Sequence, residues 1–222
     1  MGFETITVKT RDEHSFDAQL HLAAKADAPL LFFIPAPGTH MGFYSEFGAA
    51  IAEAGVHLFV VDLRGVGISS VNVAAGDNFG YREILEEDLP WALIAVRDRL
   101  KDVASIWIGG HSLGGQLATL FAARAPNGID GLVLITSGNI HFRGWPGVSS
   151  ATVAGRLLGR KPAPEVAEAR QFAEDWSSVV RSGRYRVAGA VFDYEGAMPK
   201  LRKPVLSLSF AEDKLAPDAA IR

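Results

Sequence analysis

The chain has 222 residues, 48% of them hydrophobic and 21% charged, a composition typical of a folded globular protein. Its 22 basic and 25 acidic residues give a net charge of −3, which disfavours binding to nucleic acids or anionic membranes. Cysteine is absent, which excludes disulfides, thiolate metal sites and cysteine nucleophiles. Since we find neither a signal-peptide pattern nor an apolar run long enough to span a membrane, we expect a cytoplasmic protein.

Short segments rich in β-branched and aromatic residues indicate the strands. The first two, 5–8 and 17–22, have the pattern of an antiparallel hairpin. Most of the later ones are apolar throughout rather than alternating, which indicates strands buried on both faces, as in a parallel sheet covered by helices. These later segments are 30–34, 57–61, 105–108, 132–136 and 205–210.

Helical spacing of apolar residues appears between these strands, over 43–54, 89–100 and 113–125. Pro90 must lie in the first turn of the second helix or kink it. Strands and helices therefore alternate, which predicts an α/β fold with a mostly parallel, doubly wound sheet.

The alternation stops after Thr136. Residues 137–200 separate two predicted strands, are rich in aromatic residues such as Trp145 and Trp176, and contain a predicted helix that begins at Pro164. A connection of this length is more often a lid or binding element than a simple linker. We therefore expect a core formed by 1–136 and 201–222, and a helical cap formed by 137–200.

The most specific motif is Gly110-His111-Ser112-Leu113-Gly114, which lies where a predicted strand ends and a predicted helix begins. The glycines two residues before and two residues after Ser112 permit a sharp strand-to-helix turn that exposes the serine hydroxyl. The N–H of Leu113, at the helix N-terminus, would stabilise a developing oxyanion, whereas His111 is expected to pack under the loop. A glycine-rich turn without catalytic function is the competing interpretation.

With this motif the chain resembles the α/β-hydrolase superfamily of serine hydrolases and esterases, and the resemblance extends over nearly its whole length. Residues 62–69 (DLRGVGIS) are similar to the superfamily's D-x-R-G-x-G-x-S loop, and 34–38 occupy the place of its oxyanion loop. Residues 210–217 are similar to the segment that carries the triad acid, which matches Asp213. A dinucleotide-binding fingerprint at Gly65-Val66-Gly67 is disfavoured because its third glycine is absent.

The oxyanion loop departs from the superfamily pattern. The resemblance places the oxyanion hole at Leu113, Ala36 and Pro37, but Pro37 has no N–H to donate. Either Ala36 or Gly38 replaces it, or Leu113 acts alone, and the loss of one such donor typically costs about 100- to 1,000-fold in rate.

The catalytic histidine is the second departure, because no histidine follows Asp213. His40 and His141 follow predicted strand ends and could approach Ser112, although an ordinary loop role explains each equally well. The remaining histidines are expected to be structural; they are His14, His21, His57 and His111. We therefore expect that the natural chain continues beyond Arg222 with a histidine, a last strand and a last helix.

The resemblance implies a serine hydrolase that cleaves a carboxylic ester or related acyl bond through an acyl-enzyme on Ser112. Asp213 would orient the histidine, and neither a metal nor another cofactor would be needed. The expected partner is a small-molecule acyl substrate. A non-catalytic protein of the same fold that binds a ligand or a partner is the alternative, as is an acyltransferase or carbon–carbon hydrolase.

Overall fold

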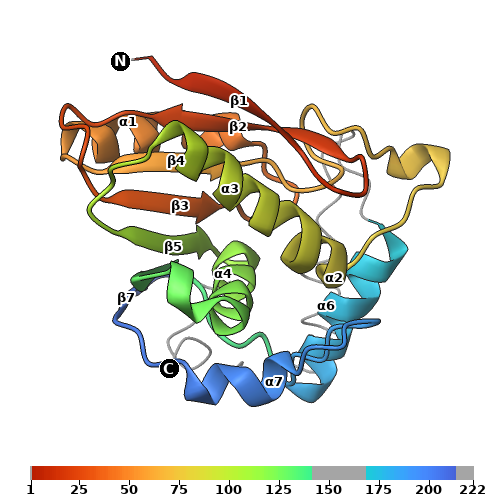
Figure 1. Cartoon of the computed structure of the whole chain (residues 1–222). Coiled ribbons are helices and arrows are strands. Elements are labelled where there is room, and N and C mark those ends of the chain that lie inside the picture. Colours follow the sequence, from red (N-terminus) through yellow and green to blue (C-terminus); the bar gives the residue numbers. More distant parts are fainter. Residues whose placement is uncertain (1, 142–168, 214–222) are drawn as a thin grey trace.

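The computed structural model describes residues 2–141 and 169–213. These residues form a seven-stranded sheet in the order β1-β2-β4-β3-β5-β6-β7 (Figure 1). The hairpin of β1 and β2 is antiparallel, β2 is antiparallel to β4, and all the other neighbours are parallel. The strands are β1 (Glu4–Lys9), β2 (Ser15–His21), β3 (Leu30–Ile34), β4 (His57–Val61), β5 (Ile106–His111), β6 (Gly131–Ile135) and β7 (Val205–Leu208).

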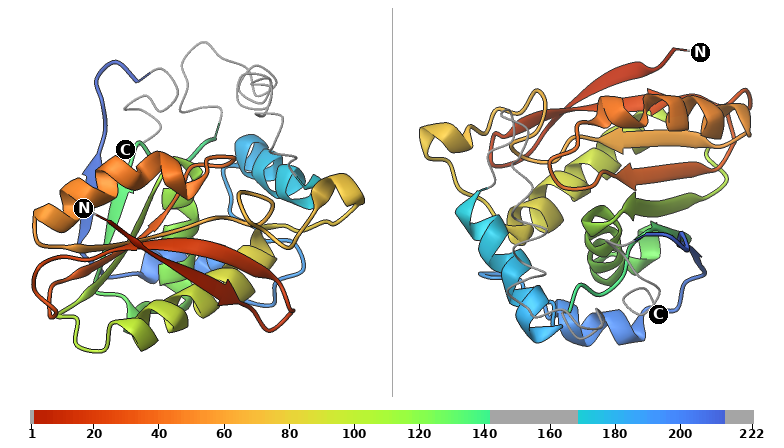
Figure 2. Two further views of the ribbon diagram at one scale, coloured as in Figure 1. Left: turned by 90° about the horizontal axis from the view of Figure 1, so that it is seen from above. Right: turned by 180° about the vertical axis from the view of Figure 1, so that it is seen from behind.

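Helices cover both faces of the sheet, as Figure 2 shows. Helix α1 (Ser45–Glu53) lies on one face, whereas α3 (Leu89–Arg99) and α4 (Leu113–Arg124) lie on the other. Along β3, Leu31 and Phe33 join the apolar cluster under α1, and Phe32 joins the larger cluster under α3 and α4. The prediction of a mostly parallel sheet is confirmed, and β3 and β4 are buried on both faces. Strand β7, at the edge of the sheet, is exposed along its whole length, so the expected burial does not hold there.

Strand β5 is longer than its predicted segment. It continues through Gly109, Gly110 and His111, which stay in register with β3 and β6. A Cβ at Gly109 would collide with the carbonyl oxygen of Val133 on β6, so this strand contains glycine where two backbones approach closely. Strand β7 ends earlier than predicted, at Leu208.

The helix around Pro90 also begins earlier than predicted. A continuous helical run consists of α2 (Tyr81–Glu83), a π-helical turn (Ile84–Asp88) and α3. The N–H of Leu89 donates to the carbonyl of Ile84, five residues back, and Pro90 follows in the first turn of α3. The π turn therefore stands directly before the residue that has no N–H to continue the helix.

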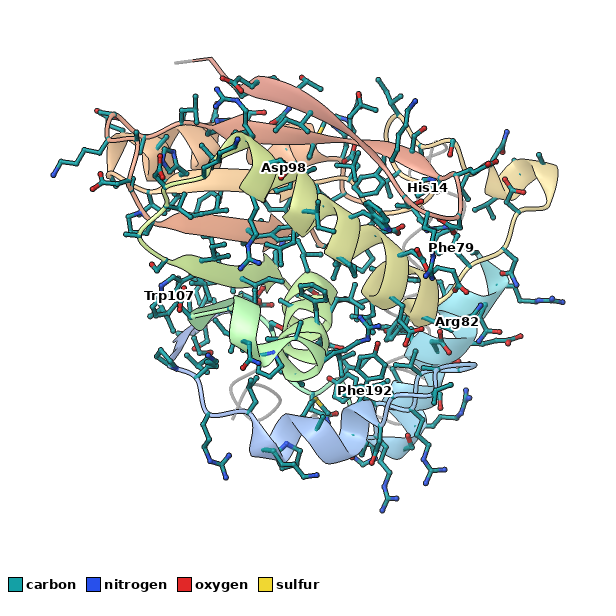
Figure 3. All side chains as sticks on the ribbon, viewed as in Figure 1. His14, Phe79, Arg82, Asp98, Trp107 and Phe192 are labelled. Carbon is teal, nitrogen blue, oxygen red and sulfur yellow. The ribbon has the colours of Figure 1, made fainter. Side chains whose placement is uncertain are left out.

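The described part of the segment between β6 and β7 contains α6 (Arg170–Ser182) and α7 (Tyr194–Ala197). The predicted helix start at Pro164 lies outside the described residues. Helix α6 buries Phe172 and Trp176 in the larger apolar cluster, and Phe79, labelled in Figure 3, lies beside it. In the described ranges, short 3-10 helices also occur at Met41–Tyr44, Val73–Ala75, Pro126–Gly128 and Met198–Lys200.

No helix in the described ranges is both long enough and apolar enough to cross a membrane.

Candidate active site

Ser112 occupies a strained turn between β5 and α4. Its backbone has φ 56° and ψ −122°, a left-handed φ that residues other than glycine rarely adopt. The Ser112 N–H donates to the carbonyl of Ile135 at 2.9 Å, and its own carbonyl accepts from the N–H of Gly115 at 3.1 Å. The neighbouring strand and the start of the helix therefore hold the serine in this conformation.

The glycines on both sides of Ser112 lie where the backbone is crowded. A Cβ at Gly110 would come within 2.6 Å of the carbonyl oxygen of Ile34, at the end of β3. A Cβ at Gly114 would collide with that same oxygen and with the carbonyl oxygen of Pro35. No larger residue fits either position unless the backbone of β3 or of the following loop moves.

Leu113 is the first residue of α4, so its N–H lies at the positive end of a 12-residue helix. Among the residues that the structure describes, no oxygen accepts from this N–H. It can therefore serve as a donor to an anionic group at the turn.

The loop after β3 is a tight turn from Ala36 to Thr39. The Thr39 N–H donates to the Ala36 carbonyl at 3.1 Å, with Pro37 and Gly38 at the corner and a φ of 66° at Gly38, as in a type II turn. The Ala36 N–H donates to the hydroxyl of Tyr44 at 3.0 Å. Two loop residues were assigned to the oxyanion hole. Pro37 has no N–H, and the N–H of Ala36 already donates to Tyr44.

His111 contacts the same hydroxyl. Its Nδ1 lies 3.0 Å from the Tyr44 Oη, and the two rings meet edge to face. Burial lowers the pKa of His111, and the negative charge of Asp213 partly opposes this shift. The expected packing of His111 under the loop thus takes the form of a hydrogen bond to Tyr44, which the sequence analysis did not identify.

Asp213 follows β7, which pairs with β6 beside β5. It is half-buried, and its N–H donates to the Phe210 carbonyl at 3.0 Å. Because β5, β6 and β7 are parallel, the end of β7 that leads to Asp213 lies at the same edge of the sheet as the turn at Ser112.

His40 forms a pair with a buried carboxylate. Its Nε2 lies 3.3 Å from Oδ2 of Asp62, and its Nδ1 accepts from the N–H of Gly42 at 2.9 Å. The other carboxylate oxygen of Asp62 accepts from the N–H of Met41 at 2.6 Å, and burial raises the pKa of this carboxyl. Both ring nitrogens of His40 are therefore occupied by its own loop and by Asp62, which leaves neither for Ser112.

Of the histidines expected to be structural, His14 and His57 have local hydrogen-bond partners. Nδ1 of His14 lies 2.9 Å from Oγ of Ser70, and burial lowers the pKa of His14 to about 4. Nδ1 of His57 accepts from the N–H of Ala23 at 3.0 Å. His21 is buried against Gly48 of α1. His141, which was considered with His40 as a residue that could approach Ser112, packs against Gly183, the residue after α6.

Arg64 of the DLRGVGIS loop is buried between two carboxylates. It pairs with Asp88 at 2.8 Å and with Asp12 at 2.7 Å, so it joins the loop to the helical run and to the N-terminal hairpin. Burial raises the pKa of Asp88 to about 7, although the guanidinium opposes this shift. The motif predicted the loop, but nothing in its pattern identified these distant partners.

No group of three or more histidine, aspartate or glutamate side chains suited to a metal ion occurs in residues 2–141 and 169–213.

Comparison with known proteins points to one family. A family model described as alpha/beta hydrolase fold matches residues 29–158. The pimeloyl-[acyl-carrier protein] methyl ester esterase of Shewanella sp. (strain MR-7) is 30% identical over 148 residues, which cover 64% of this chain and 50% of that protein. The chain thus spans about half the length of the curated relatives it matches.

Solved structures agree at the level of the fold. DcsB in complex with its substrate analogue matches with a TM-score of 0.66 and 15% identity, over 97% of this chain and 83% of that one. Est1E from Butyrivibrio proteoclasticus with bound ferulic acid matches with a TM-score of 0.64 and 21% identity, over 97% and 82% of the two chains.

Proposed function

Since the chain belongs to the alpha/beta hydrolase fold family, we propose that it is a serine hydrolase that cleaves a carboxylic ester through an acyl-enzyme on Ser112. The observation that carries this proposal is the strained backbone of Ser112, with φ 56°, at the N-terminus of α4. Strain of this kind persists only where the surrounding structure imposes it, and it clusters at functional sites. The esterases among the chain's relatives support an ester as the substrate.

The reaction begins with attack of the Ser112 hydroxyl on the acyl carbon. The oxygen of the tetrahedral intermediate becomes negative next to the Leu113 N–H, where the dipole of α4 also stabilises it. The alcohol then leaves, and water hydrolyses the acyl-enzyme. A histidine oriented by Asp213 would take the serine proton and return it to the leaving group.

A second candidate is a non-catalytic member of the family that binds an acyl ligand. The oxyanion loop favours it, because Pro37 has no N–H and the N–H of Ala36 donates to Tyr44. An oxyanion hole of this kind would depend on Leu113 and on no more than one further donor from the loop. Reactivity of Ser112 distinguishes the two candidates.

The test is labelling of the full-length protein with a fluorophosphonate probe, followed by identification of the modified peptide. We expect a label on Ser112 and its loss in Ser112→Ala, whereas Ser137→Ala, a serine substitution outside the turn, should keep it. A folded full-length protein that is not labelled would favour the ligand-binding candidate.

A further inference from the structure

The hydroxyl of Tyr44 lies between the turn after β3 and the end of β5, which leads into Ser112. On one side, the N–H of Ala36 in the turn after β3 donates to it at 3.0 Å. On the other side, Nδ1 of His111, the residue directly before Ser112, lies 3.0 Å away. One buried oxygen therefore joins the oxyanion loop to the strand end that carries the nucleophile.

In the arrangement that we infer, this hydroxyl accepts from Ala36 and donates to His111. A tyrosine hydroxyl has one proton and two lone pairs. The Ala36 N–H supplies the proton for one hydrogen bond to this oxygen. The hydroxyl proton points to Nδ1 of His111, 3.0 Å away, which places the imidazole proton on Nε2.

The position of this hydroxyl is fixed by packing. Tyr44 is 6% exposed, and its ring lies 5.2 Å from the ring of Phe33 on β3 and 5.2 Å from that of Phe43. Strands β3 and β5 are hydrogen-bonded neighbours, with Ile34 opposite Gly110, so the two loops leave the sheet side by side. A rigid ring at this place sets the distance between them.

We propose that Tyr44 and His111 are positioning residues that hold the turn at residues 36–39 in register with Ser112. This inference rests on the proposed esterase function and deepens it. Neither side chain takes part in bond making. The hydrogen bond fixes the loop that faces the oxyanion, and acylation and deacylation both form an oxyanion there. Its loss therefore slows both steps alike and leaves KM nearly unchanged.

The test compares three substitutions in the full-length protein, with p-nitrophenyl acetate as substrate. Tyr44→Phe keeps the ring and removes the hydroxyl, and we expect kcat to fall by about 10- to 100-fold with KM changed less than about twofold. His111→Ala should cause a similar loss, whereas His111→Asn, whose amide oxygen can occupy the place of Nδ1, should restore most of the rate. The double variant Tyr44→Phe/His111→Ala should lose no more than either single variant, because the pair acts as one unit.

Tyr194→Phe is the matched control. Tyr194 is also buried, on α7, and its hydroxyl donates to Glu86 at 3.3 Å, away from both loops. We expect its kcat to stay within about twofold of the wild type. An equal loss in Tyr194→Phe, or an unchanged kcat in Tyr44→Phe, would overturn the positioning role.

Nitrogen-15 NMR of the histidine side chains separates this inference from the proposed function. Nδ1 of His111 should be the unprotonated nitrogen at neutral pH, and Tyr44→Phe should raise the pKa of His111 because the neutral ring loses its donor. A proton on Nδ1 would contradict the arrangement. A wild-type protein without esterase activity would contradict the proposed function, whereas an active wild type indifferent to Tyr44→Phe would contradict only the inference.

Discussion

The turn at Ser112 and the α6 dock, by which we mean the contacts of α6 with residues 78–81, are stabilised by different kinds of contact. At Ser112 the contacts are between backbones, because Gly110 and Gly114 bring β5 and α4 against the carbonyl oxygen of Ile34. At α6 they are made by side chains. The carboxylate of Asp175 accepts from the N–H of Tyr81 at 2.8 Å, and the Asn78 side chain accepts from the N–H of Gln171 at 2.9 Å.

Because of this difference, the sequence reveals one region and not the other. Backbone crowding permits only glycine, and the glycines fall at a fixed spacing around the serine, so the pattern is visible in five consecutive residues. The α6 dock leaves no short sequence pattern, because its hydrogen-bonded residues Asp175 and Tyr81 are 94 residues apart in the chain. Three predictions test whether the two regions are as separate as this comparison implies.

The largest effect on stability is expected at the α6 dock. Phe172 is 7% exposed, and its ring lies 5.4 Å from that of Tyr81 and 6.0 Å from that of Phe79. We expect Phe172→Ala to lower the free energy of unfolding by about 3 to 5 kcal/mol, measured by urea denaturation, because it opens a cavity.

The half-exposed Phe3 provides the control, and Phe3→Ala should change stability by less than about 1 kcal/mol. Below its unfolding transition, Phe172→Ala should still be labelled at Ser112. Loss of labelling in the folded variant would mean that the α6 dock and the turn are coupled.

A smaller loss of stability, but complete loss of reactivity, is expected from Gly114→Ala. Its Cβ would collide with two carbonyl oxygens, so we expect a loss of about 1 to 3 kcal/mol in thermal unfolding together with the loss of fluorophosphonate labelling. Gly128→Ala is the control, because the nearest neighbours of its Cβ would be the terminal atoms of the flexible Arg97 side chain, at 3.3 Å or more. Equal damage from both substitutions would show that crowding against β3 is not what requires glycine at 114.

The smallest effect concerns the protonation of Asp175. Burial raises the pKa of this carboxyl in the folded protein, although the hydrogen bonds from Tyr81 and Gln171 oppose the shift. Above the usual aspartate range the folded state therefore holds a proton that the unfolded state has lost, and stability falls as the pH rises through the raised pKa.

Asp175→Asn removes this titration. Its urea midpoint should vary less than that of the wild type between about pH 4 and about pH 7. Relative to Asp175→Asn, Asp175→Ala should cost about 1 to 2 kcal/mol at any pH, because the buried N–H of Tyr81 loses its acceptor. Parallel pH profiles of the wild type and Asp175→Asn would contradict the assignment of this titration to Asp175.

Much of the core could be predicted because its strands carry a strong local signal. Segments 30–34 and 57–61 match β3 and β4 residue for residue, since unbroken apolar runs between turn residues have few other interpretations. The start of the helical run at Tyr81 was not predicted, because a π turn shifts the helical phase just before Pro90.

The candidate site, like the core, could be predicted only in part. The glycine spacing around Ser112 was readable, but the choice of oxyanion donors was not, because it depends on where the Tyr44 hydroxyl lies. That position follows from ring packing between β3 and the start of α1, and no spacing rule encodes it.

The most direct test of the account is mass spectrometry of the full-length protein quenched with acid within milliseconds of mixing with p-nitrophenyl acetate. We predict an acetyl group on the peptide that contains Ser112, formed at the rate of the p-nitrophenol burst and absent in Ser112→Ala. Ester hydrolysis without an acetylated Ser112, or with the acetyl group on another residue, would contradict the proposal that Ser112 is the nucleophile.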